Sequence, residues 1–152
     1  MANPRQYCTF YLDNYLFGIE LLRVQEVLQS LELTEVPLAP FEVRALMNLR
    51  GQIVIAVDLR RSLALPERAP EKIPMHVVVR DGDEALSLLV DEIGDVVEVE
   101  EDTFEPPPER LRGAVRSAIL GVHKLDKQLM HVLDTDRVCE TAEPGELVTP
   151  AS

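Results

Sequence analysis

Histidine and cysteine are the side chains most often used for catalysis or metal binding, and this chain has three histidines and two cysteines. His76, His123 and His131 each fall inside an apolar β-type run, with no second ligand two or four residues away. Zinc sites require such paired ligands, so the spacing favours histidines that simply belong to strands. Cys8 and Cys139 lie far apart without metal-ligand spacing, and we expect two reduced, buried thiols.

The acidic stretch from Asp91 to Asp102 is the other group of residues that could do chemistry. A calcium loop requires alternating Asp or Asn residues with a closing Glu at fixed spacing, which this stretch lacks. The seven glycines form no phosphate-binding loop, and no G-x-S-x-G motif occurs. We therefore expect no catalytic residue, no cofactor and no metal, and we interpret the acidic stretch as the solvated face of an acidic protein.

A mixture of small apolar and charged side chains is instead typical of a surface for a protein partner. Val24, Glu26 and Val27 lie in one short segment, and Arg50 precedes Gly51 at the start of an apolar run. Two valines beside two opposite charges suit a groove that binds a helix. A simpler interpretation places the valines in the core and makes Glu26 and Arg50 a local ion pair.

Composition argues against two classes of partner. The 152 residues suffice for one domain with a buried core, and 27 acidic against 15 basic residues give a net charge of −12. Nucleic acids and anionic membrane surfaces both attract basic proteins, so we expect no nucleic-acid binding and no direct membrane insertion. The chain has no secretory signal and no apolar run near ~20 residues, which predicts a cytoplasmic protein.

Short β-type runs separated by turn residues predict two hairpins. Residues 7–12 and 15–19 flank Asp13-Asn14, and residues 76–80 and 85–90 flank a turn that contains Asp-Gly. Further strands are predicted at residues 31–36, 53–57, 93–99, 118–125 and 128–133.

Three segments carry signals of helix. Residues 21–28 place apolar side chains at helical spacing, and residues 40–47 begin with a proline, which suits the first turn of a helix. Asp58 is suited to cap a short helical turn over residues 59–63. The charged, proline-rich residues 66–74 are the best candidate for a linker.

The two halves of the chain resemble each other weakly. The matching segments are 52–58 with 128–134 and, less closely, 18–27 with 87–96. This predicts two related β-rich subdomains whose sheets curl into barrels, although coincidence among valine-rich strands is an alternative. The second copy has Asp126-Lys127 where the first has Arg50-Gly51, so the arginine belongs to one copy only. That asymmetry favours a partner contact for Arg50.

Six segments, in order and with matching spacers, resemble the family of CheW-type chemotaxis coupling proteins: residues 17–19, 22–27, 36–40, 49–54, 89–96 and 120–126. The resemblance covers residues 6–140. It implies a mostly β fold with short helices, built as two intertwined five-stranded β-barrel subdomains. The first barrel is expected at roughly residues 15–66 and the second at roughly 75–135, with the N-terminal strand shared and a disordered tail at 141–152.

The resemblance also implies a function. Proteins of this kind are non-catalytic adaptors that couple transmembrane chemoreceptors to the histidine kinase CheA and are recruited from the cytoplasm to membrane-associated receptor arrays. The implied partners are the cytoplasmic hairpin tip of the receptor (a methyl-accepting chemotaxis protein) and the homologous regulatory domain of the kinase. Carried over residue by residue, the receptor-binding surface comprises Val24, Glu26, Val27 and Arg50, with Leu86 and Leu88 as candidates on its far wall.

Two other functions are compatible with parts of the sequence. A paralogous adaptor of a non-flagellar chemosensory pathway, controlling surface motility or a second messenger, would carry the same motifs, and the neighbouring genes would distinguish it. A small β-barrel enzyme or ligand-binding protein would require a pocket of convergent polar side chains, for which the sequence shows no motif.

Overall fold

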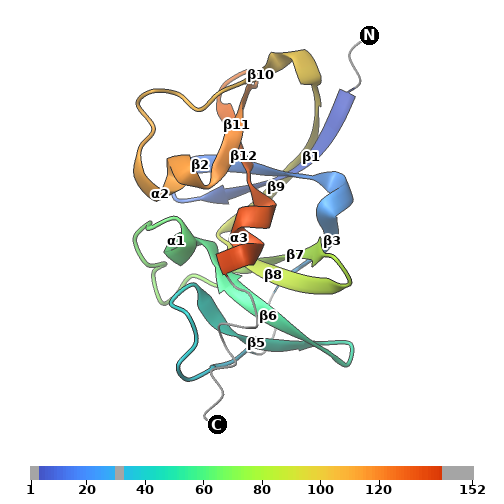
Figure 1. The fold of residues 1–152 in the computed structure, drawn as a ribbon, viewed down its shortest axis with the longest axis vertical. Helices are drawn as coiled ribbons and strands as arrows, with labels where there is room; N and C mark the ends of the chain where they lie inside the picture. Colours follow the sequence, from blue (N-terminus) through green and yellow to red (C-terminus); the bar gives the residue numbers. More distant parts are fainter. Residues whose placement is uncertain (1–3, 30–32, 142–152) are drawn as a thin grey trace.

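The computed structural model describes residues 4–29 and 33–141. In this part of the chain two six-stranded sheets lie one above the other, with three short helices near the level where they meet (Figure 1). The strand order of sheet A is β10 (Phe104–Glu105), β11 (Ile119–Lys124), β12 (Leu129–Leu133), β2 (Tyr15–Glu20), β1 (Pro4–Leu12), β9 (Glu92–Glu100). The strand order of sheet B is β3 (Val24–Leu28), β7 (Met75–Asp81), β8 (Glu84–Val90), β6 (Gln52–Asp58), β5 (Val43–Leu49), β4 (Leu33–Thr34).

The mostly β fold with two subdomains is confirmed, with two differences. Within residues 4–29 and 33–141, each sheet has six strands where five were predicted, and its two edge strands do not pair to close a barrel. Both predicted hairpins form, as β1–β2 and β7–β8. Each turn contains a residue with positive φ, 55° at Asp13 and 64° at Gly82, a conformation that Asp and Gly tolerate better than most residues.

Each hairpin belongs to the sheet formed by the other half of the chain. β1 and β2 lie in sheet A with β9 to β12, whereas β7 and β8 lie in sheet B with β3 to β6. Parallel pairing of β2 with β12 and of β8 with β6 joins each hairpin to its sheet. The sheets are therefore interleaved along the chain, and the expected boundaries at residues 15–66 and 75–135 do not separate them. Residues 66–74 lead back into sheet B and do not link the two sheets.

The strand registers reproduce the internal repeat. Val132 lies opposite Gly18 in sheet A and Ala56 lies opposite Ser87 in sheet B, which are the pairs that the sequence repeat aligns. The strand register shifts at the start of β5 in sheet B and at the matching start of β11 in sheet A. A second shift occurs where β3 pairs with β7, and a matching one occurs where β9 pairs with β1. Coincidence among valine-rich strands would not produce the same irregularities twice.

Two of the predicted helices are wrong. In residues 21–28 only Leu21–Arg23 form a 3-10 turn (η1), and the rest is the edge strand β3, whose side chains alternate in burial. Residues 40–47 lead into β5, where every second side chain is buried. This period of two was present in the sequence, but Pro40 suggested a helix start and outweighed it.

Other local predictions fare better. The buried strand at residues 53–57 is β6, and Asp58 caps α1 (Leu59–Ser62), because its Oδ1 accepts a hydrogen bond from the Arg60 N–H at 3.1 Å. The strand predicted at residues 31–36 is seen as the two-residue β4; residues 31 and 32 lie outside the described part of the chain. The predicted tail also falls outside it from residue 142 onward. The remaining helices are α2 (Gly113–Ser117) and α3 (Thr135–Thr141).

The main hydrophobic core lies between the two sheets. Phe10 and Phe17 of hairpin β1–β2 pack there with Val57 and Leu88 of sheet B, and all four are fully buried. Burial of such side chains contributes about 1.5–3 kcal/mol each, so this core holds the sheets together. Two smaller clusters lie within the individual sheets, one around Met47, Val54 and Leu89 and one around Tyr7, Met130 and Val132.

An ion-pair network stabilises one crossing between the sheets. Asp91 is the single residue between β8 of sheet B and β9 of sheet A. Its carboxylate accepts hydrogen bonds from Arg60 at 2.6 and 2.9 Å, from Arg68 at 2.9 Å and from the Asp13 N–H at 2.9 Å. Burial opposes the charged form, but these hydrogen bonds outweigh it and lower the pKa of Asp91 to about 2.

Candidate partner-docking site

Three of the predicted partner contacts lie on β3, an edge strand of sheet B that, in the described part of the chain, pairs only with β7. Val24 is half-buried and packs against the main core. Val27 is 37% exposed, and the Glu26 side chain is 18% exposed. We call Val24, Glu26, Val27 and Arg50 together the B face.

Arg50 is held in place by a tight turn between β5 and β6. Its φ is 51°, Gly51 follows with a φ of 88°, and the Asn48 Oδ1 accepts a hydrogen bond from the Gly51 N–H at 2.8 Å. Two successive residues with positive φ are typical of the turns that match the twist of a hairpin. The backbone of Arg50 is thus fixed, and its side chain projects from the end of the hairpin with 69% exposure.

Arg50 reaches across to β3 and pairs with Glu26. The Arg50 Nη1 donates to the Glu26 Oε2 at 2.5 Å and the Nη2 donates to the Oε1 at 2.7 Å. These hydrogen bonds lower the pKa of Glu26 and raise the pKa of Arg50, so both stay charged near neutral pH. The ion pair of the simpler interpretation therefore forms. Val27 nevertheless remains on the surface, so the B face has both an apolar and a charged part.

Leu86 and Leu88 require a correction. Both lie on β8 in the main core, and they are 5% and 0% exposed. Because β8 is an inner strand between β7 and β6, these side chains pack between the sheets and offer no surface to a partner. We therefore exclude them from the B face.

An exposed residue that the sequence reasoning missed adjoins the B face. Leu22 in η1 is 87% exposed and lies two residues before the start of β3. Its carbonyl accepts a hydrogen bond from the Arg80 Nη1 at 2.9 Å, and the Arg23 Nη2 donates to the Arg80 carbonyl at 2.9 Å. These bonds attach the turn to β7. A helix over residues 21–28 would place Leu22 outside the apolar stripe, so the sequence analysis did not select it.

A family model for the CheW-like domain matches residues 6–143. The chain belongs to the CheW-like family. The chemotaxis protein CheW of Treponema pallidum is 27% identical over 146 residues, covering 93% of this chain and 86% of that protein. The chemotaxis protein CheW of Klebsiella aerogenes is 24% identical, covering 91% of this chain and 84% of that protein.

A solved structure agrees with these sequence comparisons. The crystal structure of the scaffolding protein TtCheW from Thermoanaerobacter tengcongensis matches with a TM-score of 0.78 and 26% identity, covering 87% of this chain and 90% of that chain. The two interleaved sheets are therefore the CheW-like fold, and the resemblance noted from six sequence segments is confirmed. The family role is that of a chemotaxis scaffold.

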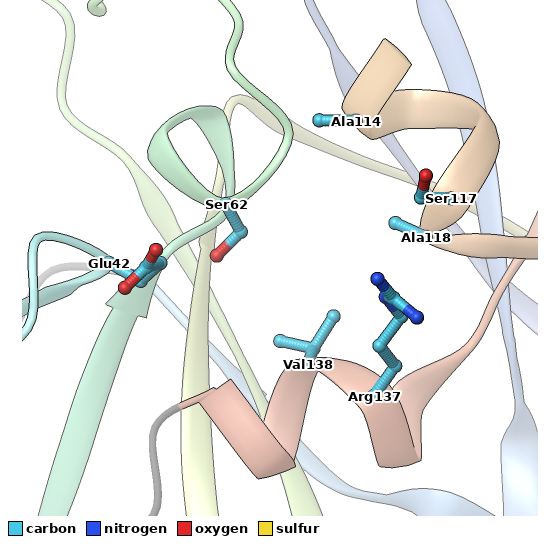
Figure 2. Close-up of a pocket in the computed structure, with 7 residues that line it drawn as sticks. All are labelled: Glu42, Ser62, Ala114, Ser117, Ala118, Arg137 and Val138. Atoms are coloured by element: carbon cyan, nitrogen blue, oxygen red, sulfur yellow. The ribbon is translucent and has the colours of Figure 1, made fainter. Parts of the chain in front are cut away.

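A cavity of about 270 Å³ lies between α1, α2 and α3 of this CheW-like chain (Figure 2). It is lined by Glu42, Ser62, Ala114, Ser117, Ala118, Arg137 and Val138. In Figure 2 the Arg137 side chain points from α3 toward α2, and Ser62 lies on the α1 side. Among the described residues, the buried Ser62 Oγ has no hydrogen-bond partner. Of the two serines in the lining, Ser117 donates its hydroxyl hydrogen bond to the Gly113 carbonyl at 3.2 Å and not to the Glu42 carboxylate.

The three histidines lie in strands, as predicted, and the structure shows that all three are buried. His76, His123 and His131 are 1%, 1% and 8% exposed. The His76 Nδ1 lies 3.1 Å from the Ser87 Oγ, and the His131 Nδ1 donates to the Leu16 carbonyl at 2.9 Å. Across residues 4–29 and 33–141, no three His, Cys, Asp or Glu side chains are grouped to hold a metal ion. The helices described in those ranges are also too short or too polar to span a bilayer.

Proposed function

We propose that this chain is a non-catalytic adaptor that couples chemoreceptors to the histidine kinase CheA. Its B face would bind the cytoplasmic hairpin tip of a methyl-accepting chemotaxis receptor. The observation that carries the proposal is the B face itself, in which exposed Val27 adjoins the Glu26–Arg50 ion pair at the edge of a sheet in a CheW-like fold. The four residues are those that the family resemblance assigns to receptor binding.

The geometry suits a helical partner. Val27 and Leu22 supply apolar surface that a helix can cover, at about 25 cal/mol per Å² buried. Among the described residues only Glu26 accepts hydrogen bonds from Arg50, so three of the five guanidinium N–H groups remain for carboxylates or carbonyls of the partner. Because Glu26 already holds the arginine extended, less side-chain entropy is lost on binding.

The second partner in this proposal is the regulatory domain of the kinase, which has the same fold as the adaptor. An adaptor of this kind makes and breaks no bonds. It transmits the state of the receptor by holding receptor and kinase in a fixed geometry, so the interface energies and the spacing between sites determine the output. The protein would work in the cytoplasm and be recruited to receptor arrays at the membrane.

The substitution Arg50→Glu tests the proposal. It places two acids together on the exposed rim, removes the donors offered to the receptor and leaves the core untouched. We expect a folded protein, judged by circular dichroism, that no longer co-sediments with membranes containing receptor and CheA. Lys72→Glu makes the same charge change in the exposed 66–74 loop and should co-sediment normally. Wild-type co-sedimentation of the Arg50 variant would refute the assignment of the B face.

The substitution Glu26→Arg separates the two partners. It opposes Arg50 with a second cation, so the B face loses its ion pair while the rest of sheet B is unchanged. We expect a larger loss of affinity for the receptor hairpin than for the isolated regulatory domain of the kinase, both measured by calorimetry. Equal losses on the two partners would place Glu26 outside the receptor contact.

A further inference from the structure

A second cavity, of about 310 Å³, lies in sheet A at the edge that carries β10. Its lining comes from β1, β2, β10, β11 and β12 and from the 3-10 turn η2 (Glu101–Thr103). The side chains of Tyr7, His123 and Val132 are the buried part of the lining, whereas Phe104 and Leu120 are exposed and lie nearer the opening. We call this cavity the β10 cavity. Its lining shares no residue with the B face or with the cavity between the helices.

The wall of the β10 cavity is aromatic. The ring of His123 contacts the rings of Tyr7 and Phe104, with centroids 5.6 and 5.3 Å apart. Aromatic rings attract another ring that stacks with an offset or approaches edge-on. An apolar cavity of about 150 Å³ is enough to hold benzene, so the β10 cavity has room for a molecule of one or two rings.

His123 gives this wall a single hydrogen-bond acceptor. The Thr103 Oγ1 donates its only hydrogen to the Glu100 carbonyl at 2.9 Å, so it must accept from the His123 Nδ1, which also lies at 2.9 Å. Burial, together with the charge of Arg5, lowers the pKa of His123, so the ring is neutral near pH 7. The Nε2 is then an acceptor, and it has no hydrogen-bond partner among the described residues.

The opening of the β10 cavity carries charges that already neutralise one another in part. Arg5 donates to Glu20 at 2.8 Å and to Glu101 at 2.5 Å, so one cation is shared by two carboxylates. The remaining charge is negative, and an anionic ligand would be repelled. A neutral molecule therefore suits the cavity best.

The matched place in sheet B shows that the fold does not require a histidine here. Met47 pairs with Leu33 as His123 pairs with Phe104, so Met47 takes the place of His123. Met47 is buried and packs in the small cluster of sheet B with Leu33 and Ala56. An apolar side chain thus satisfies the fold, whereas a buried acceptor without a partner costs free energy. A ligand that donates to His123 would recover that cost.

We propose that the β10 cavity binds a small, neutral aromatic molecule that carries one O–H or N–H donor. Its ring packs against Tyr7 and Phe104, and its donor makes a hydrogen bond to the His123 Nε2. This ligand site goes beyond the proposed adaptor function and does not depend on receptor binding by the B face.

Titration of the full chain with phenol and with toluene tests the proposal, because the two molecules have the same shape and differ in the donor. We expect phenol to cause saturable NMR shifts at the backbone amides of Tyr7, Phe104 and His123. Phenol should bind about tenfold more tightly than toluene, which is the upper range for one hydrogen bond. Benzoate, which is an anion at pH 7, should cause no such shifts. Absence of saturable shifts with phenol, or equal affinities for phenol and toluene, would refute the proposal.

Two histidine variants show whether His123 is the acceptor. His123→Phe keeps an aromatic ring but removes the Nε2, so phenol and toluene should bind it equally. His76→Phe removes an equally buried histidine of sheet B, outside the cavity, and should keep the preference of the wild type for phenol. Circular dichroism checks that both variants fold, and if His123→Phe does not fold, the comparison of the two ligands on the wild type still decides. A tenfold preference for phenol that persists in folded His123→Phe would overturn the assignment.

Discussion

In sheet B the turn between β5 and β6 carries Arg50, which pairs with Glu26 of β3, whereas in sheet A the corresponding turn carries Asp126 and the strand carries Asp95. The strand order and the registers around the two sites are the same. The backbone plan is fixed by buried side chains that tolerate little change in shape. The exposed rim is free of that constraint, so one fold presents two surfaces of different charge.

The interiors of the two sheets also differ at one matched position. Gly121 on β11 and Ala45 on β5 occupy the same place beside the same register shift. A Cβ at Gly121 would collide with the Phe104 ring and with the Glu105 carbonyl. Leu33 takes the place of Phe104 in sheet B, where Ala45 is accommodated and fully buried. Sheet A thus combines the larger Phe104 with Gly121, whereas sheet B combines the smaller Leu33 with Ala45.

Gly121→Ala should have the largest effect on stability. The added methyl group meets backbone at Glu105, which cannot rotate away, and we expect a loss of about 3 kcal/mol in the free energy of unfolding. The matched change Ala45→Gly in sheet B should cost only about 0.5–1 kcal/mol. Urea denaturation of both variants measures the difference. Similar losses would mean that the two sheets are packed alike at this position.

The chain crosses from sheet to sheet twice, once through the exposed η1 and once through the half-buried Asp91, and Asp91→Asn tests the difference between these crossings. The pKa of Asp91 is about 2 in the folded protein against an ordinary 3.8, so its charged form stabilises the fold above pH ~4, and this contribution is lost as the pH falls toward 2. We expect the variant to lose about 2 kcal/mol at pH 7. The acid limb of its stability curve should be flatter, as measured by urea denaturation between pH 2 and pH 7.

Leu22→Ser, at the other crossing, is the control for Asp91→Asn. Leu22 is 87% exposed and its side chain carries no charge. Its replacement should therefore change neither the free energy of unfolding at pH 7 nor the shape of the acid limb. If Asp91→Asn behaved like Leu22→Ser, the network of Asp91 with Arg60 and Arg68 would contribute nothing in solution.

Asp126→Arg should have a smaller effect, on binding and not on stability. It places an arginine in the β11–β12 turn, as Arg50 lies in the β5–β6 turn, with Ile93, Asp95 and Val96 at the places that Val24, Glu26 and Val27 occupy in sheet B. We expect a second, weaker binding event for the receptor hairpin in calorimetry, beyond the single one of the wild type. Asp126→Asn, which removes the charge without adding a guanidinium, should leave one event. A single binding event in both variants would show that residue 126 does not account for the difference between the two sheets in receptor binding.

The smallest expected effect concerns the titration of Glu26. The hydrogen bond from Arg50 is the main reason that the pKa of Glu26 lies below its ordinary value. Arg50→Gln weakens that bond, so the pKa of Glu26 should rise toward the ordinary value, as followed by NMR of the side-chain carboxyl carbon. An unchanged titration would mean that the pair does not form in solution and that the B face presents two independent charges.

Much of the candidate site could be predicted from the sequence, and the failures have physical causes. Val24, Glu26, Val27 and Arg50 were found through residue types and the family resemblance, and the structure brings them together. The resemblance also suggested Leu86 and Leu88, yet both are buried. A strand of alternating apolar residues does not reveal which of its faces is covered until its neighbours in the sheet are known.

By itself, the sequence determined the local features of this protein: both hairpins, the buried strand that Asp58 ends, the repeat of its two halves and the tight turn at Arg50. These depend on φ preferences and on periodicity within a few residues. Only the tertiary structure decided that each hairpin joins the other half of the chain, that residues 24–28 form an edge strand, and that Glu26 meets Arg50. Those outcomes require contacts between distant residues, and their free energy appears only when the shared core between the sheets forms.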